Sequence, residues 1–155
     1  KLVIAPHVID ENHLVEIIRK LKRPYVRYTR ADERNVLKAD CLIIDCFGLL
    51  SSIYRYGEIA YIGGGFGAGI HNPLEAAVYG MPVLFGPRYH KFKEAKDLIA
   101  VGGGFSITDD SSFRTKMDEL LTDPTALETS GQAAGDFVKN SVGATDQILR
   151  QIHIR

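Results

Sequence analysis

A glycine-rich loop between two apolar runs constrains the fold of this chain more than any other feature. The first run, residues 59–62, leads into residues 63–69, which are mostly glycine, and residues 82–85 form the second run. Between them, residues 71–75 (His-Asn-Pro-Leu-Glu) open a segment with helical spacing. This order predicts parallel strands joined by a crossover helix, and such sheets bind ligands at the carboxyl ends of their strands. We therefore expect the functional site in this loop and at the start of this helix.

The rest of the chain repeats the alternation of strands and helices. Further strands are expected at residues 2–5, 25–28, 41–44 and 105–108, and further helices at residues 10–20, 49–56, 92–100, 109–122, 124–139 and 144–152. Residues 29–38 are predicted to be a polar connection, and the strand at residues 2–5 is predicted to be buried. The pattern indicates one domain, residues 1–155, of the α/β class: a doubly wound, Rossmann-like, mostly parallel sheet with helices on both faces.

Apolar spacing predicts the buried face of two helices. The first carries Leu14, Ile17, Ile18 and Leu21 on one side, and the helix after residue 109 carries Phe113, Met117, Leu120 and Leu121 on one side. Asp10 or Asn12 is expected to cap the first of these helices, and Asp109 or Asp110 the second.

Composition excludes few functions but indicates the cellular compartment. The formal net charge is zero, so no global field favours nucleic acid or an anionic membrane. No apolar run is long enough to span a bilayer, and Cys41 and Cys46 show no metal-ligand spacing, which favours a reduced, cytosolic setting. Lys1 stands directly before an apolar run, so we expect a piece of a longer protein that lacks its N-terminal part.

The glycine loop allows three interpretations. Its G-x-G spacing is compatible with a dinucleotide fingerprint, but no acidic residue follows the next strand, which ends at Gly86-Pro87. A tight turn is the plain structural alternative, because glycine alone tolerates a positive φ at low cost. The density of glycine favours a loop whose backbone approaches a ligand.

The segment after the loop is more specific, and two readings of it stay open. Asn72 is a good N-cap, Pro73 fits the first helical position and Glu75 fits the third, which together describe ordinary capping. The same geometry suits a nucleotide, since helix N-terminal N–H groups favour a phosphate and a carboxylate accepts hydrogen bonds from a ribose diol.

The remaining candidates carry weaker signals. Residues 45–50 and the dipeptide Pro6-His7 each end a predicted strand at the same sheet edge, where backbone could face a ligand. The histidines show no metal-ligand spacing, and the basic loop at residues 88–91 is most simply solvated charge. No serine lies in a nucleophile-elbow context.

With these residues in view, the chain resembles the C-terminal half of a GT-B glycosyltransferase, specifically the 3-deoxy-D-manno-octulosonic acid (Kdo) transferases of lipopolysaccharide synthesis. That family has the ordered motifs D-T-x-G-E-L, F-V-G-G-S, G-G-H-N-x-L-E-P and P-V-x-F-G-P. The corresponding residues here are 45–50, 61–65, 69–76 and 82–87. The resemblance covers nearly the whole chain, and the H-N-P-L-E run is its most specific part.

The resemblance implies a donor-nucleotide-binding domain of an enzyme that transfers Kdo from CMP-Kdo to a lipid A precursor with inversion. The acceptor domain and the catalytic carboxylate would lie in an N-terminal domain absent from this chain, so no catalytic residue is expected here. No metal, no cofactor beyond the donor substrate CMP-Kdo and no nucleic-acid partner are implied. The full-length enzyme would work at the cytoplasmic side of the bacterial inner membrane, and the fragment would be soluble and inactive alone.

Carried over by position, the resemblance also implies the nucleotide-binding residues. These are Pro6, His7, Phe47, Gly48, Leu49, Leu50, Gly64, Gly65, Asn72 and Glu75. Pro6 and His7 would border the cytosine, residues 47–50 would offer backbone to base and phosphate, Asn72 would approach the phosphate, and Glu75 the ribose hydroxyls. The chain departs from the family pattern at His7, where arginine is common, at Leu49 in place of glutamate, and at Ala76 in place of proline.

Other classes remain as alternatives. A GT-B transferase or epimerase domain that uses a UDP-sugar would need more anion donors near the glycine loop. A non-catalytic domain that has lost its ligand would be compatible with the departures at His7 and Leu49. An NAD-binding module is disfavoured by the missing acidic residue.

Overall fold

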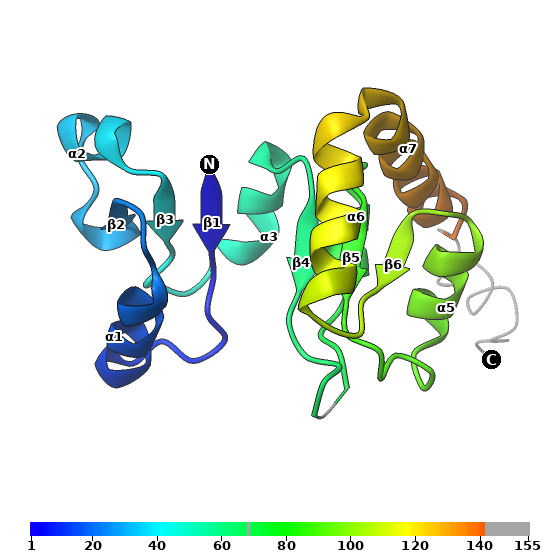
Figure 1. Ribbon diagram of the computed structural model, residues 1–155, viewed down its shortest axis with the longest axis horizontal. Coiled ribbons are helices and arrows are strands. Elements are labelled where there is room, and N and C mark those ends of the chain that lie inside the picture. Colours follow the sequence, from blue (N-terminus) through cyan, green and yellow to red (C-terminus); the bar gives the residue numbers. More distant parts are fainter. Residues whose placement is uncertain (68, 142–155) are drawn as a thin grey trace, which may run out of the picture. The chain divides into compact units, whose positions relative to one another are not determined.

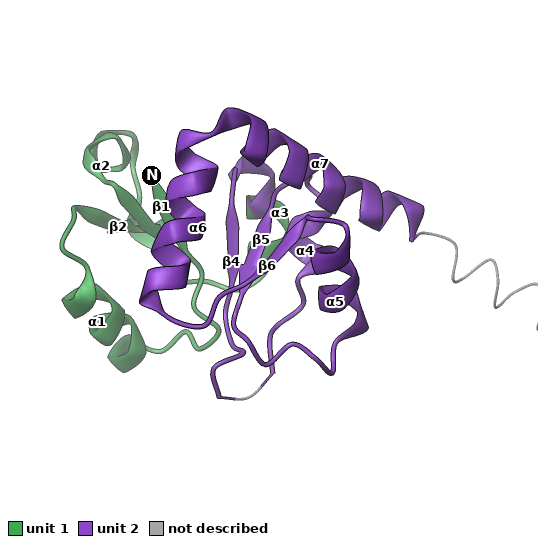
Figure 2. Cartoon of the chain, turned by 45° about the vertical axis from the view of Figure 1, so that its right-hand side comes forward, with its two compact units in different colours: residues 1–53 green, residues 54–155 purple. Residues whose placement is uncertain are grey.

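The computed structural model describes residues 1–67 and 69–141 of the chain (Figure 1). Strands and helices alternate, and the strand ladders are parallel, which confirms the α/β class. The chain divides into two compact units, one of residues 1–53 and one that begins at Tyr54 (Figure 2). Each unit has its own three-stranded sheet.

The first unit is built on a sheet in the order β1-β3-β2. Its elements are β1 (Leu2–Ile4), α1 (Glu11–Lys20), β2 (Tyr25–Arg27), a 3₁₀ helix (Tyr28–Arg30), α2 (Glu33–Lys38), β3 (Cys41–Ile43) and α3 (Leu50–Ile53). The side chain of Asp10 caps α1 by accepting a hydrogen bond from the backbone N–H of His13. Leu14 on the apolar face of α1 then packs on Cys41 and Ile43 of β3, as the spacing predicted.

Two predictions for the first unit are wrong. Residues 29–38 are not a plain polar connection, because a capping box starts α2. The Asp32 side chain accepts a hydrogen bond from the backbone N–H of Asn35, and the Asn35 side chain accepts one from the backbone N–H of Asp32. The strand at residues 2–5 is not buried, since Leu2 and Val3 are 51% and 47% exposed. β1 is an edge strand of this sheet, whereas β3 has a neighbouring strand on each side, so the residues of β1 have fewer neighbours to pack against.

The second unit is built on a sheet in the order β4-β5-β6. Its elements are a 3₁₀ helix (Tyr54–Tyr56), β4 (Ala60–Ile62), α4 (Leu74–Ala77), β5 (Val83–Phe85), α5 (Lys93–Ala100), β6 (Gly104–Ser106), α6 (Asp110–Thr122) and α7 (Pro124–Asn140). Asp109 caps α6, as predicted, and Pro124 lies in the first turn of α7. The cap of α7 is Asp123, which was not predicted to be a cap.

The central strand β5 is covered on both faces, which explains its uninterrupted apolar sequence. Val83 and Phe85 lie in a core cluster with residues of α4, α5 and α7, whereas Leu84 points to the other face and packs with Leu120 of α6. All three strand residues are fully buried. The prediction of helices on both faces of the sheet is therefore confirmed in this unit.

Smaller predictions for this half need correction. Leu121 does not share the buried face of α6, because it is 65% exposed whereas Leu120 is 1% exposed. The helix expected at residues 49–56 is an α-helical turn that ends at Ile53, followed by the 3₁₀ turn. The helix predicted at residues 144–152 lies outside the described residues.

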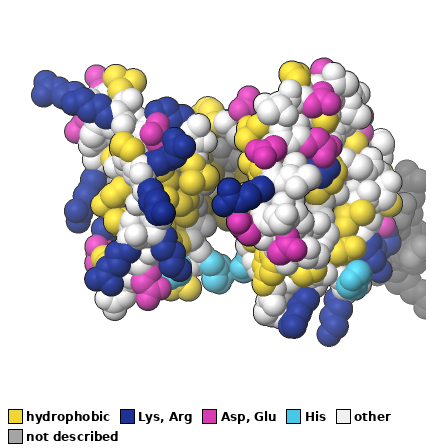
Figure 3. All heavy atoms as spheres, in the orientation of Figure 1, with side chains coloured by type: hydrophobic (Ala, Val, Ile, Leu, Met, Phe, Trp, Pro, Cys, Tyr) yellow, Lys and Arg dark blue, Asp and Glu magenta, His cyan; other side chains and the backbone are white. Residues whose placement is uncertain are grey.

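Charge is distributed unevenly over the two units. In the view of Figure 3, Lys and Arg side chains are prominent on the first unit, and Asp and Glu side chains are prominent over α6 of the second. The formal net charge of zero is thus the sum of a more basic and a more acidic unit. Within the described ranges, no helix has both the length and the apolar character that crossing a membrane requires.

Candidate functional site

Parallel strands bring the predicted site residues of each unit to one sheet edge. In the first unit, Pro6 and His7 follow β1, and residues 47–50 follow β3, so both segments lie at the carboxyl edge of that sheet. In the second unit, residues 63–75 follow β4 at the carboxyl edge of the other sheet. The ten candidates are therefore divided between the two units rather than drawn from one loop.

The glycine loop is folded back on itself. Gly64 forms an antiparallel bridge with Ile70, and the backbone N–H of Gly65 donates to the carbonyl of Gly69 over 3.2 Å. Gly64 and Gly65 have φ of +90° and +83°, so glycine is required at both positions. Arg88 fastens the loop from outside, since its backbone N–H donates to Gly65 and its guanidinium to the carbonyl of Gly67 over 2.6 Å.

These glycines allow close contact with other backbone segments of the protein rather than with a ligand. A Cβ atom on Gly65 would lie 2.8 Å from the backbone of Gly86, and one on Gly64 would lie 2.4 Å from the carbonyl oxygen of Gly69. Gly65 is buried, whereas Phe66 beside it is exposed. The alternative of a tight structural turn thus explains why glycine stands at both positions without a ligand.

Asn72 and Glu75 lie at the start of α4 and are hydrogen bonded to each other. The Asn72 Oδ1 accepts from the backbone N–H of Leu74 over 3.0 Å, and its Nδ2 donates to Glu75 Oε1 over 3.3 Å. The predicted positions are wrong by one residue, because α4 begins at Leu74 with Pro73 at its N-cap, although the Asn72 side chain still accepts from the first helical N–H. Glu75 contacts the Asn72 side chain rather than closing a capping box. Because α4 is only four residues long, its dipole is small, and any anion here would depend on hydrogen bonds instead.

Glu75 acts electrostatically on a neighbouring phenol. Burial raises the pKa of Tyr54, and the nearby Glu75 carboxylate raises it further. Asn72 and Glu75 are both exposed, so polar groups of a ligand can reach them. A carboxylate offers about four acceptor positions, of which the contact with Asn72 occupies one.

The turn after β3 is open to solvent. Gly48 has a φ of +87°, and Phe47 beside it is 81% exposed. Leu49 directly precedes α3, and its carbonyl accepts from the backbone N–H groups of Ser52 and Ile53. In the part of the chain that the structure describes, no group accepts a hydrogen bond from the backbone N–H of Gly48, Leu49 or Leu50. These N–H groups are the donors that an anionic ligand would need.

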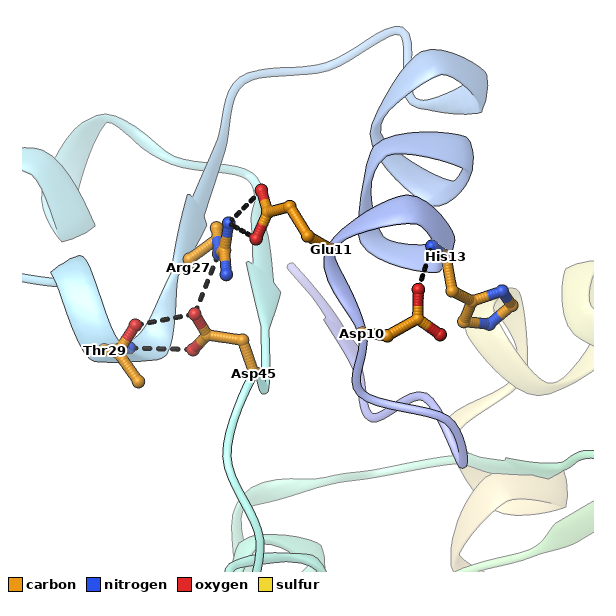
Figure 4. Close-up of polar contacts among 6 residues, drawn as sticks. All are labelled: Asp10, Glu11, His13, Arg27, Thr29 and Asp45. Atoms are coloured by element: carbon orange, nitrogen blue, oxygen red, sulfur yellow. Dashed lines mark hydrogen bonds and ion pairs between the residues drawn. The ribbon is translucent and has the colours of Figure 1, made fainter.

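Beside this turn lies a charged network that the sequence reasoning did not find (Figure 4). Asp45 Oδ1 accepts from the backbone N–H of Thr29 over 2.9 Å, and Oδ2 accepts from Thr29 Oγ1 over 2.6 Å and from Arg27 Nε over 2.8 Å. The Arg27 Nη1 also donates to both carboxylate oxygens of Glu11 at 2.8 and 2.9 Å. Asp45 carried two signals: it directly follows a buried strand, where a carboxylate requires partners, and it opens the segment that matches the motif D-T-x-G-E-L.

The network keeps Asp45 ionised. Burial acts to raise its pKa, but the hydrogen bonds from Thr29 and Arg27 outweigh burial and lower the pKa to about 2. The Asp45 side chain is only 1% exposed. Asp45 is therefore unsuited to act as a general acid or base near neutral pH, because it stays ionised and its oxygens are already hydrogen bonded.

Arg27 does not supply the cation that is missing at His7. Its guanidinium is matched by two carboxylates, those of Asp45 and Glu11, so the group carries no net positive charge toward a ligand. Among the described residues, no cluster of three His, Cys, Asp or Glu side chains could hold a metal ion.

The parallel α/β units, with open loops at the carboxyl edges of their sheets, have the fold of the C-terminal half of a GT-B protein. The same fold is found in the crystal structure of the C-terminal CMP-Kdo binding domain of WaaA from Acinetobacter baumannii. That structure matches with a TM-score of 0.75 and 22% identity, over 86% of this chain and 71% of the other. No protein-family model matches the sequence.

Curated relatives agree on one name, 3-deoxy-D-manno-octulosonic acid transferase. The protein from Aquifex aeolicus is 35% identical over 79% of this chain, that from Rickettsia conorii is 33% identical over 76%, and that from Chlamydia pneumoniae is 27% identical over 97%. The chain spans only 34%, 26% and 35% of the length of these three relatives. The chain is therefore a homologue of one segment of the Kdo transferases, which confirms the resemblance seen in its motifs.

Proposed function

We propose that this chain is the donor-nucleotide-binding domain of a Kdo transferase, which moves Kdo from CMP-Kdo to a lipid A precursor with inversion. The observation that carries the proposal is the single name shared by relatives that match 76–97% of the chain. The likeness in fold to a domain described as CMP-Kdo binding supports the same donor. The acceptor and the general base would belong to an N-terminal domain of the whole enzyme, which would act at the cytoplasmic side of the bacterial inner membrane.

In this proposal, the residues carried over from the family motifs contact the nucleotide. In the first unit, Pro6 and His7 border the cytosine, and the open N–H groups of residues 48–50 donate to base and phosphate. In the second unit, Asn72 approaches the phosphate and Glu75 accepts hydrogen bonds from the ribose hydroxyls. The exposure of Asn72, Glu75 and Phe47 supports these roles, because a ligand can reach each of them.

The chemistry proposed for this domain is stabilisation of the leaving group. As an acceptor hydroxyl attacks the anomeric carbon of Kdo, the bond from that carbon to the phosphate oxygen breaks and CMP departs. The hydroxyl proton passes to the base outside this chain. Negative charge then grows on the phosphate, and preorganised backbone N–H groups lower the barrier by hydrogen bonding to it.

Calorimetric titration of the chain with CMP, UMP and UDP tests the proposal. We expect CMP to bind more tightly than UMP, with amide NMR shifts at Gly48, Asn72 and Glu75. A preference for UDP would favour a UDP-sugar enzyme instead. Absence of binding by any of the three would favour a domain that has lost its ligand. Product formation from CMP-Kdo and lipid acceptor by this chain alone would contradict the placement of the base in another domain.

A further inference from the structure

We infer that Asp45, Arg27 and Glu11 form a positioning network that holds both ligand-facing loops of the first unit. Neither the names of the relatives nor the motifs give these residues a role. The nucleotide part of the inference rests on the proposed function, whereas the positioning part concerns the loops alone. Its structural basis is the set of hydrogen bonds shown in Figure 4.

The first link runs from Asp45 to the turn after β3. Asp45 lies two residues before Phe47, and its carboxylate is joined to β2 and the residues after it by Arg27 and Thr29. The point where the chain leaves the sheet is thus fixed by three hydrogen bonds. The turn itself has an exposed Phe47 and a glycine with positive φ, so it has little packing of its own to fix its course.

The second link runs from Arg27 to the loop after β1. Glu11 is the first residue of α1, and its bidentate pair with Arg27 ties the start of this helix to the end of β2. The loop of residues 5–10, which contains Pro6 and His7, therefore has both ends held: one by the pairing of β1 with β3, the other by this ion pair. One guanidinium thus connects the end of the loop after β1 to the start of the turn after β3.

The two arms of the network differ in strength. The arm to Asp45 is buried, with side chains 15% and 1% exposed, whereas Glu11 is 67% exposed. Charge-assisted bonds are stronger where water is excluded, and exposed ion pairs contribute little. Loss of the Asp45 arm is therefore expected to release the turn strongly, and loss of the Glu11 arm to loosen the first loop mildly.

The test compares Asp45→Asn, Glu11→Gln and a control, Cys41→Ala, by amide hydrogen exchange without ligand. Cys41 is buried at the opposite end of β3, so its substitution disturbs the same core away from the turn. We expect Asp45→Asn to speed exchange at residues 46–50 by about tenfold relative to the control, since local opening follows the stability of the segment. Glu11→Gln should change exchange at residues 7–10 only, since Pro6 has no amide N–H.

The second readout is CMP affinity under conditions where every variant is folded. Asp45→Asn should weaken binding about tenfold, roughly the contribution of one hydrogen bond, whereas Cys41→Ala should leave it unchanged. If Asp45→Asn does not fold, Thr29→Val removes one donor while keeping shape and charge, and should give the same pattern more weakly.

The outcomes separate the two ideas. Equal exchange at residues 46–50 in the Asp45 variant and the control would overturn the positioning network, whether or not CMP binds. Faster exchange there in a chain that does not bind CMP would uphold the network and remove the proposed ligand. Weaker CMP binding by Cys41→Ala as well would mean that any loss of stability weakens binding, and would contradict a specific role of Asp45 in CMP binding.

Discussion

Gly65 and Gly86 are in direct backbone contact, one in the loop after β4 and the other directly after β5. A Cβ atom on Gly86 would lie 2.7 Å from the carbonyl carbon of Gly65 and 2.6 Å from the carbonyl oxygen of Gly64. Real Cβ atoms do not approach backbone this closely, so no side chain fits on either glycine without moving the loop. The contact explains why the sequence Phe85-Gly86-Pro87 closes the second apolar run.

Gly86→Ala should destabilise the second unit, because the added methyl has no space. Overpacking of this kind costs about 1–3 kcal/mol. Gly67→Ala is the matched control, since a Cβ there meets nothing within 4 Å and Gly67 lacks a positive φ. Urea unfolding followed by circular dichroism measures both. Equal stability of the two variants would mean that the loop shifts away from Gly86 at no cost.

Gly131→Ala should also destabilise the chain, although replacing a glycine in the middle of a helix by alanine usually increases stability. In an ordinary helix this change stabilises by up to about 1 kcal/mol. Here the new Cβ would lie 2.4 Å from the carbonyl oxygen of Gly80, where α7 packs beside the turn after α4. Gln132→Ala, at the exposed neighbouring position, tests helix propensity alone. A gain in thermal midpoint for both variants would contradict the contact.

Acid should weaken the first unit through Asp45. The ordinary pKa of the group is 3.8 and the folded value is about 2, so the folded state favours the ionised form. Its contribution, about 2 kcal/mol for a depression of this size, is complete above the ordinary pKa and lost as the pH falls from there through the folded pKa. Urea unfolding watched by amide NMR signals of this unit should show wild type and Asp45→Asn converging from pH 5 to pH 2.5. A difference that stays constant over this range would exclude Asp45 as the source.

Glu75→Gln should weaken CMP binding through the ribose. Replacing the carboxylate turns charge-assisted hydrogen bonds into neutral ones, which are about half as strong, so a loss of roughly tenfold is expected. The 2′,3′-dideoxy analogue of CMP is the matched ligand, because it lacks both hydroxyls. Its affinity should be the same for wild type and variant by calorimetry. An equal loss for both ligands would place Glu75 away from the ribose.

Local sequence signals predicted most of the secondary structure. Asp10 and Asp109 cap the helices that their positions indicated, because capping depends on residues only two or three positions apart. The buried strand β5 was predicted from its apolar run for a similar reason. The failure at α2 was also local, since the capping box of Asp32 and Asn35 was present in the sequence and was not used.

The site was only partly predictable. Asn72 and Glu75 were identified from helix-start spacing and family motifs, and the structure pairs them as neighbours three residues apart. The network of Glu11, Arg27 and Asp45 was missed, because its members are 16 and 18 residues apart and no periodic pattern links them.

The sequence by itself determined the parallel α/β class, most helix starts and the relationship to Kdo transferases, because these depend on periodicity, capping and ordered motifs. Only the tertiary structure decided what the glycines and charges do. Gly65 is glycine because of Gly86, and Asp45 is held ionised by Arg27 and Thr29. Such contacts join residues that are close only after the strands have paired, so their energies are not encoded in any local stretch of the chain.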